Sequence, residues 1–146
     1  MDKIFKTSIF KDRVLVNMND YLKSLNFNFV RFVDDVNIFG GNTVAIEYKN
    51  EIRQISIYYS PDIGDKHSEF VLIHIHKIPN GVVSVSRLLE KKGLYFESNL
   101  YKEGKDFESM VDDYCSYLIF VFDTYLKMIL SGKDWVDISI DWYDYK

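Results

Sequence analysis

The stretch from residue 106 to residue 132 constrains the fold of this chain more than any other part of the sequence. Its apolar residues recur at steps of three and four, which places them on one stripe of an α-helix. They are Phe107, Met110, Val111, Tyr114, Leu118, Val121, Phe122, Tyr125 and Ile129. Asp106 is suited to cap the first turn, and Gly132 can adopt the left-handed conformation that ends the last turn. Residues 117–122 are apolar nearly all round, so we predict a central core helix that is enclosed on more than one side.

The same stretch is too short and too often charged to cross a membrane. A membrane-spanning helix needs about 18 or more residues in a row without charge. Charged side chains interrupt the stretch at Asp112, Asp113, Asp123 and Lys127. The first 13 residues also carry several charges and no continuous apolar segment, which is not the pattern of a secretory signal. We therefore expect a cytoplasmic protein without a membrane segment.

Length and composition favour one globular domain over residues 1–146. A chain of 146 residues, 47% of them hydrophobic and with eleven Tyr and eleven Phe, can build a full core. The net charge of −4 disfavours nucleic acid as a partner, because proteins that bind it usually present a basic surface. The only cysteine, Cys115, cannot form an internal disulfide, and it falls within the predicted central helix, where we expect a buried thiol.

A second, weaker helical stripe covers residues 12–25. Its apolar residues are Val14, Leu15, Met18, Tyr21, Leu22 and Leu25. We expect Asp12 to cap the first turn and Asn26 to end the helix.

From Phe27 onward the periodicity changes to the alternation that is typical of β-strands. Four segments alternate in this way: residues 27–34, 43–49, 54–59 and 69–78. Gly40-Gly41 indicates a turn between the first two, and the link at residues 49–51 leaves room only for a tight hairpin. Links this short join antiparallel neighbours.

A short helix is predicted near residues 84–92. Ser84 or Ser86 can cap it, and Gly93 follows as the residue that ends it. Residues 94–104 show no regular period, so we expect an irregular connection whose aromatic residues pack against the body of the protein. These aromatic residues are Tyr95, Phe96 and Tyr101.

Together these segments predict an α+β fold. It consists of an antiparallel β-meander of at least four strands packed against a long C-terminal helix, with an N-terminal helix and a short helix near 84–92. We expect Leu118 and Phe122 of the long helix to meet the apolar face of the sheet. The sheet residues expected there are Ile55, Ile57, Val71, Ile73 and Ile75.

Two histidines, His74 and His76, project from one face of the fourth predicted strand, and His67 precedes them. Two imidazoles two residues apart can share a metal ion, and a third ligand would complete a zinc site. No cysteine lies near them in the sequence. The alternative is that both histidines simply occupy the less buried face of the sheet. We favour this alternative and expect no cofactor and no bound transition metal.

The sequence contains no motif that indicates catalysis. The adjacent carboxylates Asp34-Asp35 and Asp112-Asp113 point to different sides of their elements, so they do not converge as an acid and a base. The chain also has no glycine-rich phosphate loop, no Gly-x-Ser-x-Gly motif and no Cys–His nucleophile pattern. We expect a protein that is not an enzyme.

Several aromatic residues lie in segments that cannot all be core. They are Tyr58, Tyr95, Tyr101, Trp135, Trp142, Tyr143 and Tyr145. Tyr and Trp on a surface, interspersed with Asp, are typical of protein interfaces. Alternatively, these rings pack the loops and the tail onto the body of the protein.

The tail after residue 135 combines acidic and aromatic residues. Its alternating pattern predicts an extra edge strand or an extended arm. A basic partner would be attracted by the carboxylates and held by the rings. The candidate partner-binding residues are Asp137, Asp141, Trp142 and Tyr143.

The order of these parts resembles that of small cytosolic immunity proteins, which neutralise polymorphic or contact-delivered bacterial toxins. The resemblance rests on the following features: a leading helix that enters a strand at residues 25–27, a Gly-Gly turn before residues 43–48, the strand sequence at 55–59, the helix sequence at 86–90 and the long aromatic helix. It covers most of the chain as an arrangement and not as a motif. The resemblance implies tight binding to a toxin domain and identifies no site residue.

We therefore expect a non-enzymatic protein-binding protein of the immunity type, with a protein partner such as a basic toxin domain. Two other functions stay open: a small-molecule or metal-binding domain that uses the face of His74 and His76, and an accessory protein that self-associates. Zinc that is retained through purification would favour the first of these, and a concentration-dependent oligomer would favour the second.

Overall fold

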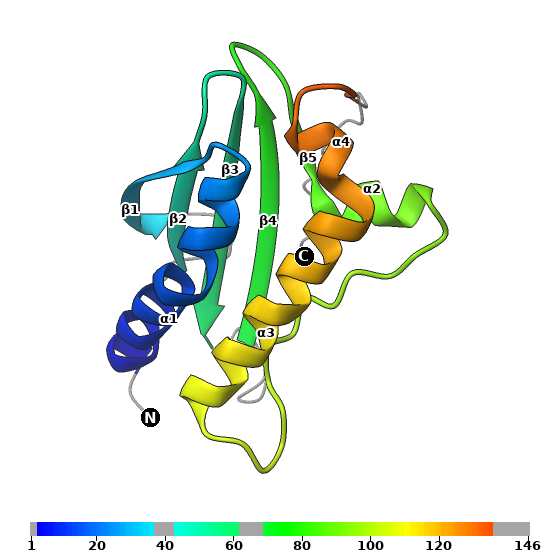
Figure 1. Cartoon of the computed structure of the whole chain (residues 1–146). Helices are drawn as coiled ribbons and strands as arrows, with labels where there is room; N and C mark the ends of the chain where they lie inside the picture. Colours follow the sequence, from blue (N-terminus) through cyan, green and yellow to red (C-terminus); the bar gives the residue numbers. More distant parts are fainter. Residues whose placement is uncertain (1–2, 37–42, 62–68, 136–146) are drawn as a thin grey trace.

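The computed structural model describes residues 3–36, 43–61 and 69–135 (Figure 1). Its centre is one five-stranded antiparallel sheet with the strand order β1-β2-β3-β4-β5. The strands are β1 (Asn28–Val36), β2 (Thr43–Lys49), β3 (Arg53–Pro61), β4 (Glu69–Lys77) and β5 (Val82–Ser84). The predicted meander is therefore confirmed. The three-residue strand β5 was not predicted, because it is too short to show an alternating pattern.

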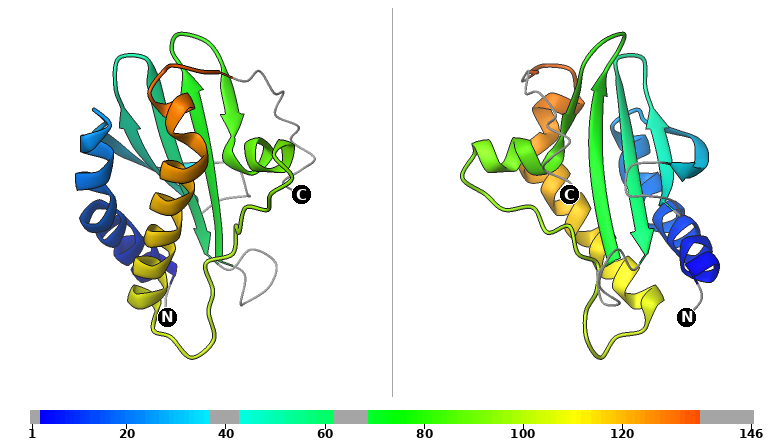
Figure 2. Two further views of the ribbon diagram at one scale, coloured as in Figure 1. Left: turned by 45° about the vertical axis from the view of Figure 1, so that its right-hand side comes forward. Right: turned by 180° about the vertical axis from the view of Figure 1, so that it is seen from behind.

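Helices cover one face of this sheet and one of its edges. They are α1 (Lys3–Ser24), α2 (Val85–Lys91), α3 (Phe107–Val121), the π-helical turn η1 (Phe122–Leu126) and α4 (Lys127–Leu130). Helices α1 and α3 both begin at the lower end of the molecule in Figure 1 and lie across the same face, whereas α2 follows the short edge strand β5. Figure 2 shows the sheet from behind, with these two long helices on its far side. The α+β architecture is the predicted one.

The core lies between the sheet and helices α1 and α3. Leu118 and Phe122 are completely buried in it, as predicted. The predicted sheet partners belong to the same cluster and are also completely buried: Ile55, Ile57, Val71, Ile73 and Ile75. Helix α1 contributes Phe10, whose ring stacks on Tyr59 of β3 with 4.3 Å between the centroids.

Helix α1 begins nine residues before the predicted start. Asp12 is exposed in the middle of the helix, so its predicted role as an N-cap is wrong. The additional turns are held by contacts distant in sequence, because Lys6 donates to the buried Glu69 carboxylate of β4 at 2.6 Å. The predicted end is confirmed, since Asn26 adopts a φ of 67° just after the helix.

The central helix also differs from its prediction in one detail. Its predicted cap is confirmed, because the Asp106 carboxylate accepts the Ser109 N–H at 2.7 Å. Its predicted end is confirmed as well, since Gly132 has a φ of 84°. The helix is interrupted by the π turn η1, and an added residue in a turn shifts the helical phase. Tyr125, expected in the buried stripe, is therefore only half-buried, and Leu126 is buried instead.

The connection between α2 and α3 is irregular, as predicted. The Ser84 hydroxyl caps α2 by accepting the Arg87 N–H at 3.1 Å. Farther along, residues 98–100 run beside the start of β4, where the Val71 N–H donates to the Ser98 carbonyl at 2.8 Å. Phe96 is buried, but Tyr95 is 78% exposed, so its predicted packing against the body is wrong.

Candidate binding surface on helix α3

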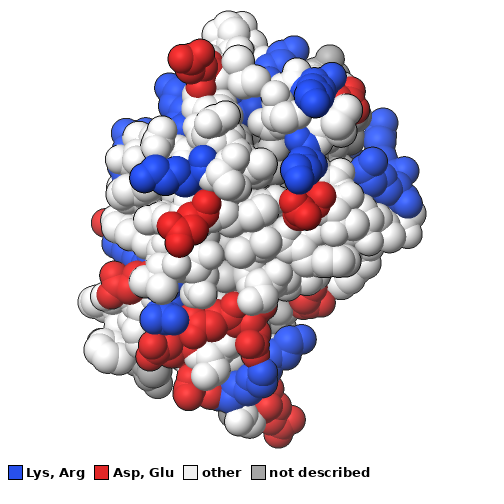
Figure 3. Space-filling view, in the orientation of Figure 1, with Lys and Arg blue, Asp and Glu red and all other residues white. Residues whose placement is uncertain are grey.

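Four aromatic side chains form a surface on α3, η1 and the connection that precedes α3. We call Tyr95, Tyr117, Phe120 and Tyr125 the aromatic surface. Tyr95 is 78% exposed and Phe120 is 54% exposed, whereas the other two rings are half-buried. An uncharged area covers the middle of this side of the molecule, with charged residues around it (Figure 3). Exposed aromatic area of this kind is a feature of sites that bind other proteins.

Ring contacts hold three of the four side chains of the aromatic surface in place. Phe120 and Tyr125 meet edge to face, with 6.0 Å between the ring centroids and 89° between the planes. Tyr117 packs on the buried Phe96, with 5.8 Å between the centroids. Burial is the main reason why the pKa of the Tyr117 hydroxyl is raised. The hydrogen bond from the Glu97 N–H opposes this effect, and the nearby Glu97 carboxylate and the hydroxyls of Tyr95 and Tyr125 add to it. Tyr117 therefore lies near both Tyr95 and Tyr125.

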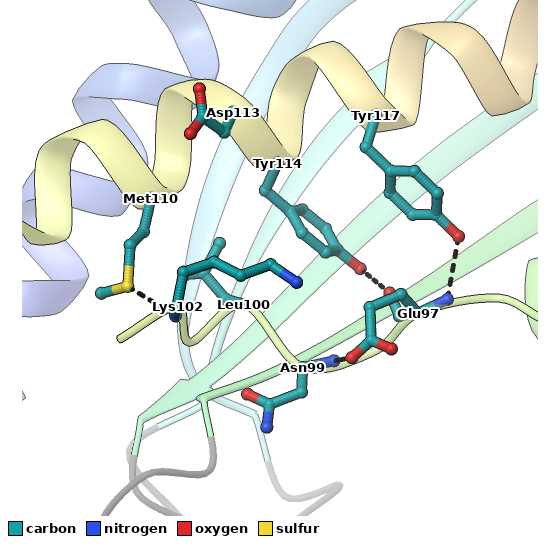
Figure 4. A pocket seen from close by; sticks show the side chains of 8 residues that line it. All are labelled: Glu97, Asn99, Leu100, Lys102, Met110, Asp113, Tyr114 and Tyr117. Carbon is teal, nitrogen blue, oxygen red and sulfur yellow. Dashed lines mark hydrogen bonds between the residues drawn. The ribbon is translucent and has the colours of Figure 1, made fainter. Parts of the chain in front are cut away.

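A pocket opens beside Tyr117, between α3 and the connection (Figure 4). Its volume is about 350 Å³. Helix α3 lines it with Met110, Asp113, Tyr114 and Tyr117. The connection lines it with Glu97, Asn99, Leu100 and Lys102. We call this cavity the Glu97 pocket.

Hydrogen bonds fix Glu97 in this pocket through both its backbone and its side chain. The Tyr114 hydroxyl donates to the Glu97 carbonyl, and the Glu97 N–H donates to the Tyr117 hydroxyl at 2.8 Å. The Asn99 N–H donates to the Glu97 Oε1 at 3.0 Å. The carboxylate also lies near the Tyr95 hydroxyl, whose pKa it raises. Glu97 consequently presents a carboxylate of fixed direction at the edge of the aromatic surface.

The other charged residues at the pocket are more exposed. Asp113 forms an ion pair with Lys105. The Lys102 N–H donates to Met110 Sδ at 2.9 Å, and the side chain of Lys102 extends along the pocket toward Tyr114. Lys102 forms no ion pair with any residue that the structure describes.

The neighbouring carboxylate Asp112 has a structural role. Arg13 of α1 donates to it twice, from Nε at 2.7 Å and from Nη2 at 3.0 Å. The Asn17 amide donates to the same carboxylate at 2.7 Å. The hydrogen bond from Arg13 is the main reason why the pKa of Asp112 is lowered. Asp112 therefore joins α3 to α1, and Asp113 points elsewhere, as predicted for adjacent residues.

The two histidines lie on the sheet face opposite α1 and α3. His74 is only 3% exposed, but His76 is half-buried, whereas Val71, Ile73 and Ile75 on the other face of β4 are completely buried. The histidines therefore lie on the less buried face, as predicted. Burial lowers the pKa of His74 to about 4, and the nearby His76 adds to this effect. His76 Nε2 lies 3.3 Å from the Ser56 hydroxyl. Within residues 3–36, 43–61 and 69–135, no three His, Cys, Asp or Glu side chains are placed to share a metal ion; His67 lies outside these ranges.

The predicted partner-binding residues of the tail, Asp137, Asp141, Trp142 and Tyr143, lie outside the described residues. Their role stays a prediction. Trp135, just before them, is half-buried and packs under two cations, with Arg53 at 4.9 Å and Lys77 at 5.6 Å from its ring centre. For Trp135 the alternative interpretation, packing onto the body, is the correct one.

Sequence reasoning identified Tyr95 as a surface residue but missed the rest of the aromatic surface. Tyr117 and Phe120 belong to the run that is apolar nearly all round. The sheet, α1 and the connection at Phe96 enclose α3 on several sides, and Phe120 marks the side that stays open. The apolar run could have indicated an exposed apolar surface, because a helix packed against a sheet and one neighbouring helix leaves part of its circumference in solvent.

Comparison of this chain with protein-family models, with curated proteins and with solved structures finds no match. None of the helices in the described part of the chain has the length and apolar character that a membrane crossing requires.

Proposed function

We propose that this chain is a non-enzymatic binding protein of the immunity type, which binds and neutralises a toxin domain through the aromatic surface. The observation that carries this proposal is the exposure of two large aromatic side chains, Tyr95 at 78% in the connection before α3 and Phe120 at 54% on α3 itself. Tyr and Phe supply large, stiff contact areas, and a few such residues provide most of the binding energy in protein interfaces.

The rigidity beneath the aromatic surface supports the proposal. Tyr117 rests on Phe96 and accepts the Glu97 N–H, while Arg13 holds α3 against α1 through Asp112. A surface that is already ordered loses little conformational entropy when a partner binds. Tight binding is what neutralisation of a toxin requires.

The surroundings of the titratable groups support a function without catalysis. The Glu69 carboxylate is engaged by Lys6 at 2.6 Å and by the Tyr59 hydroxyl at 2.8 Å. Asp112 is engaged by Arg13, and His74 is buried with a lowered pKa. These groups hold elements of the fold together, whereas general acids and bases must reach a substrate.

The test is co-expression with a toxin domain encoded beside the gene for this chain. The wild-type chain should restore growth and bind the purified toxin domain in isothermal titration calorimetry. Phe120→Ala and Tyr95→Ala should each weaken binding by about tenfold or more, as expected when a large aromatic contact is removed from an interface.

Phe5→Ala is the matched control, because Phe5 is a similarly exposed phenylalanine, 57% accessible, on α1 and outside the aromatic surface. It should bind the toxin as the wild type does. Equal binding by all three variants would exclude the aromatic surface as the interface. Growth arrest that the wild-type chain does not relieve, or a concentration-dependent dimer lost in Phe120→Ala, would contradict the immunity role.

A further inference from the structure

We propose that the Glu97 pocket accepts a cationic side chain, arginine or lysine, presented by the protein that docks on the aromatic surface. This inference rests on the proposed function, because it assigns a specific anchor point to the same interface. It concerns the chemistry of the partner, which the aromatic surface alone leaves undetermined.

The first argument is the fixed carboxylate. The backbone of Glu97 is bonded on both sides, by the Tyr114 hydroxyl and to the Tyr117 hydroxyl. An ionised carboxylate offers about four acceptor positions, of which the Asn99 N–H and the Tyr95 hydroxyl use two. The carboxylate can therefore accept further N–H donors without rearrangement, and a guanidinium or ammonium group supplies such donors in charge-assisted form.

The second argument is the character of the walls. The rings of Tyr114 and Tyr117 stand 5.5 Å apart, and Leu100 and Met110 complete the apolar lining. Arg and Lys pack their aliphatic stems along apolar surface while the charged head meets a polar group. Tyrosine faces also attract cations directly. The volume of about 350 Å³ lies at the small end of ligand pockets, as expected if one side chain fills it.

Lys102 distinguishes a cationic occupant of the pocket from an anionic one. Its side chain lines the pocket and extends toward Tyr114 (Figure 4). The pocket thus already borders a cation of the chain itself, and a cation from a partner would have to displace it. An acidic side chain from a partner would instead use Lys102 as its anchor. Replacing Lys102 therefore changes binding in opposite directions for a cationic and an anionic occupant.

The experiment titrates the isotopically labelled full chain with capped amino acids and follows the backbone amides of Glu97 and Asn99 by NMR. The probes are N-acetyl-arginine amide, N-acetyl-lysine amide, the neutral N-acetyl-norleucine amide and the anionic N-acetyl-glutamate amide. The two cationic probes should give saturable shifts at these amides and should bind about fivefold or more tightly than the neutral probe, which is the contribution expected from an exposed ion pair and ring contacts.

Two variants test whether the pocket prefers a cation. Glu97→Gln should remove the preference for cationic over neutral probes, whereas Lys102→Ala should tighten binding of the arginine probe about two- to fivefold. Glu103→Gln removes an exposed carboxylate that does not line the pocket and should leave every titration unchanged. Circular dichroism checks that each variant is folded.

Three results would overturn the inference. They are tighter binding of the glutamate probe with loss in Lys102→Ala, equal binding of the arginine and norleucine probes, and no saturable shift up to about 50 mM arginine probe. Because the probes need no partner protein, these results leave the proposed function standing if Phe120→Ala still weakens toxin binding. Conversely, if the chain binds the cationic probes but does not neutralise the toxin, the inference about the pocket is supported and the proposed immunity role is contradicted.

Discussion

The guanidinium of Arg53 donates from Nε to the carbonyl of Ile129 at 2.9 Å, and so joins the first residue of β3 to the end of α4. The same group donates to the carbonyls of Ile52 and Asp134, both at 3.1 Å. Arg53 is only 5% exposed, and burial lowers the pKa of its guanidinium. The carbonyls in the last turn of a helix can accept bonds from outside the helix, and here Ile129 accepts one from a side chain of the sheet in addition to the Gly132 N–H at 3.2 Å.

Arg53→Met should destabilise the protein by about 2–4 kcal/mol, because the substitution removes all three hydrogen bonds that the buried guanidinium donates. Urea denaturation followed by far-UV circular dichroism measures this loss. Arg31→Met is the control, since Arg31 pairs with Glu47 from an exposed position and should change stability by less than about 1 kcal/mol. Equal effects of the two substitutions would show that the bonds to the helix end do not contribute.

Leu118→Ala should cost about 2–5 kcal/mol of unfolding free energy, because Leu118 is completely buried between α3 and the sheet. Phe120→Ala, on the open side of the same helix, should cost less than about 1 kcal/mol. Thermal or urea unfolding of both variants decides the point. A loss below about 1 kcal/mol for Leu118→Ala would mean that α3 is peripheral to the core.

Acid should destabilise the protein through His74. Its pKa in the folded protein is about 4, below its ordinary value of 6.5, so the unfolded chain binds the proton more readily. Stability is full above about pH 6.5 and falls as the pH drops toward 4, by up to about 3 kcal/mol. Urea unfolding of wild type and His74→Gln between pH 4 and 7 tests this, and the variant should show the flatter profile. Parallel profiles would assign the acid sensitivity to other groups.

Cys115 should be unreactive in the folded protein. Burial raises the pKa of its thiol to about 12, and the thiolate is the reactive form. Ellman's reagent at pH 8 should detect no thiol in the native state and one thiol per chain in urea. Rapid stoichiometric reaction of the native protein would show that α3 opens readily near Cys115.

The sheet was predictable because the patterns that define its strands and hairpins lie within short stretches of the sequence. Alternation within β2 and the short link to β3 defined both strands and their hairpin, and the registers follow from that geometry. The start of α1 was not predictable in this way. Its first turns are stabilised by Lys6, which reaches the buried Glu69 from 63 residues away in the sequence. A lysine in a weak helical pattern gives no indication of a partner so distant.

The candidate site was predictable only in part. The exposed Tyr95 lies in a segment without regular period, and composition alone indicated a surface residue there. Whether Tyr117 and Phe120 are exposed depends on which sides of α3 the sheet and α1 cover. Periodicity shows which residues share one side of a helix, but not which element covers that side. Glu97 carried no signal in the sequence, since its fixed direction comes from the hydroxyls of Tyr114 and Tyr117.

Because of the π turn at Phe122–Leu126, the number of residues in this part of the long helix decides which of its side chains face the core and which face solvent. Each residue advances an α-helix by about 100°, so the added residue sets the phase of α4 relative to α3. Deleting one residue within this turn would let a continuous helix form, but Ile129 and Leu130 could then not keep their buried positions while Phe120 and Tyr125 keep theirs. A single-codon deletion would thus reorganise the aromatic surface without changing any of its rings. Insertions and deletions, more than substitutions, are therefore the sequence changes by which relatives of this chain could acquire different partners.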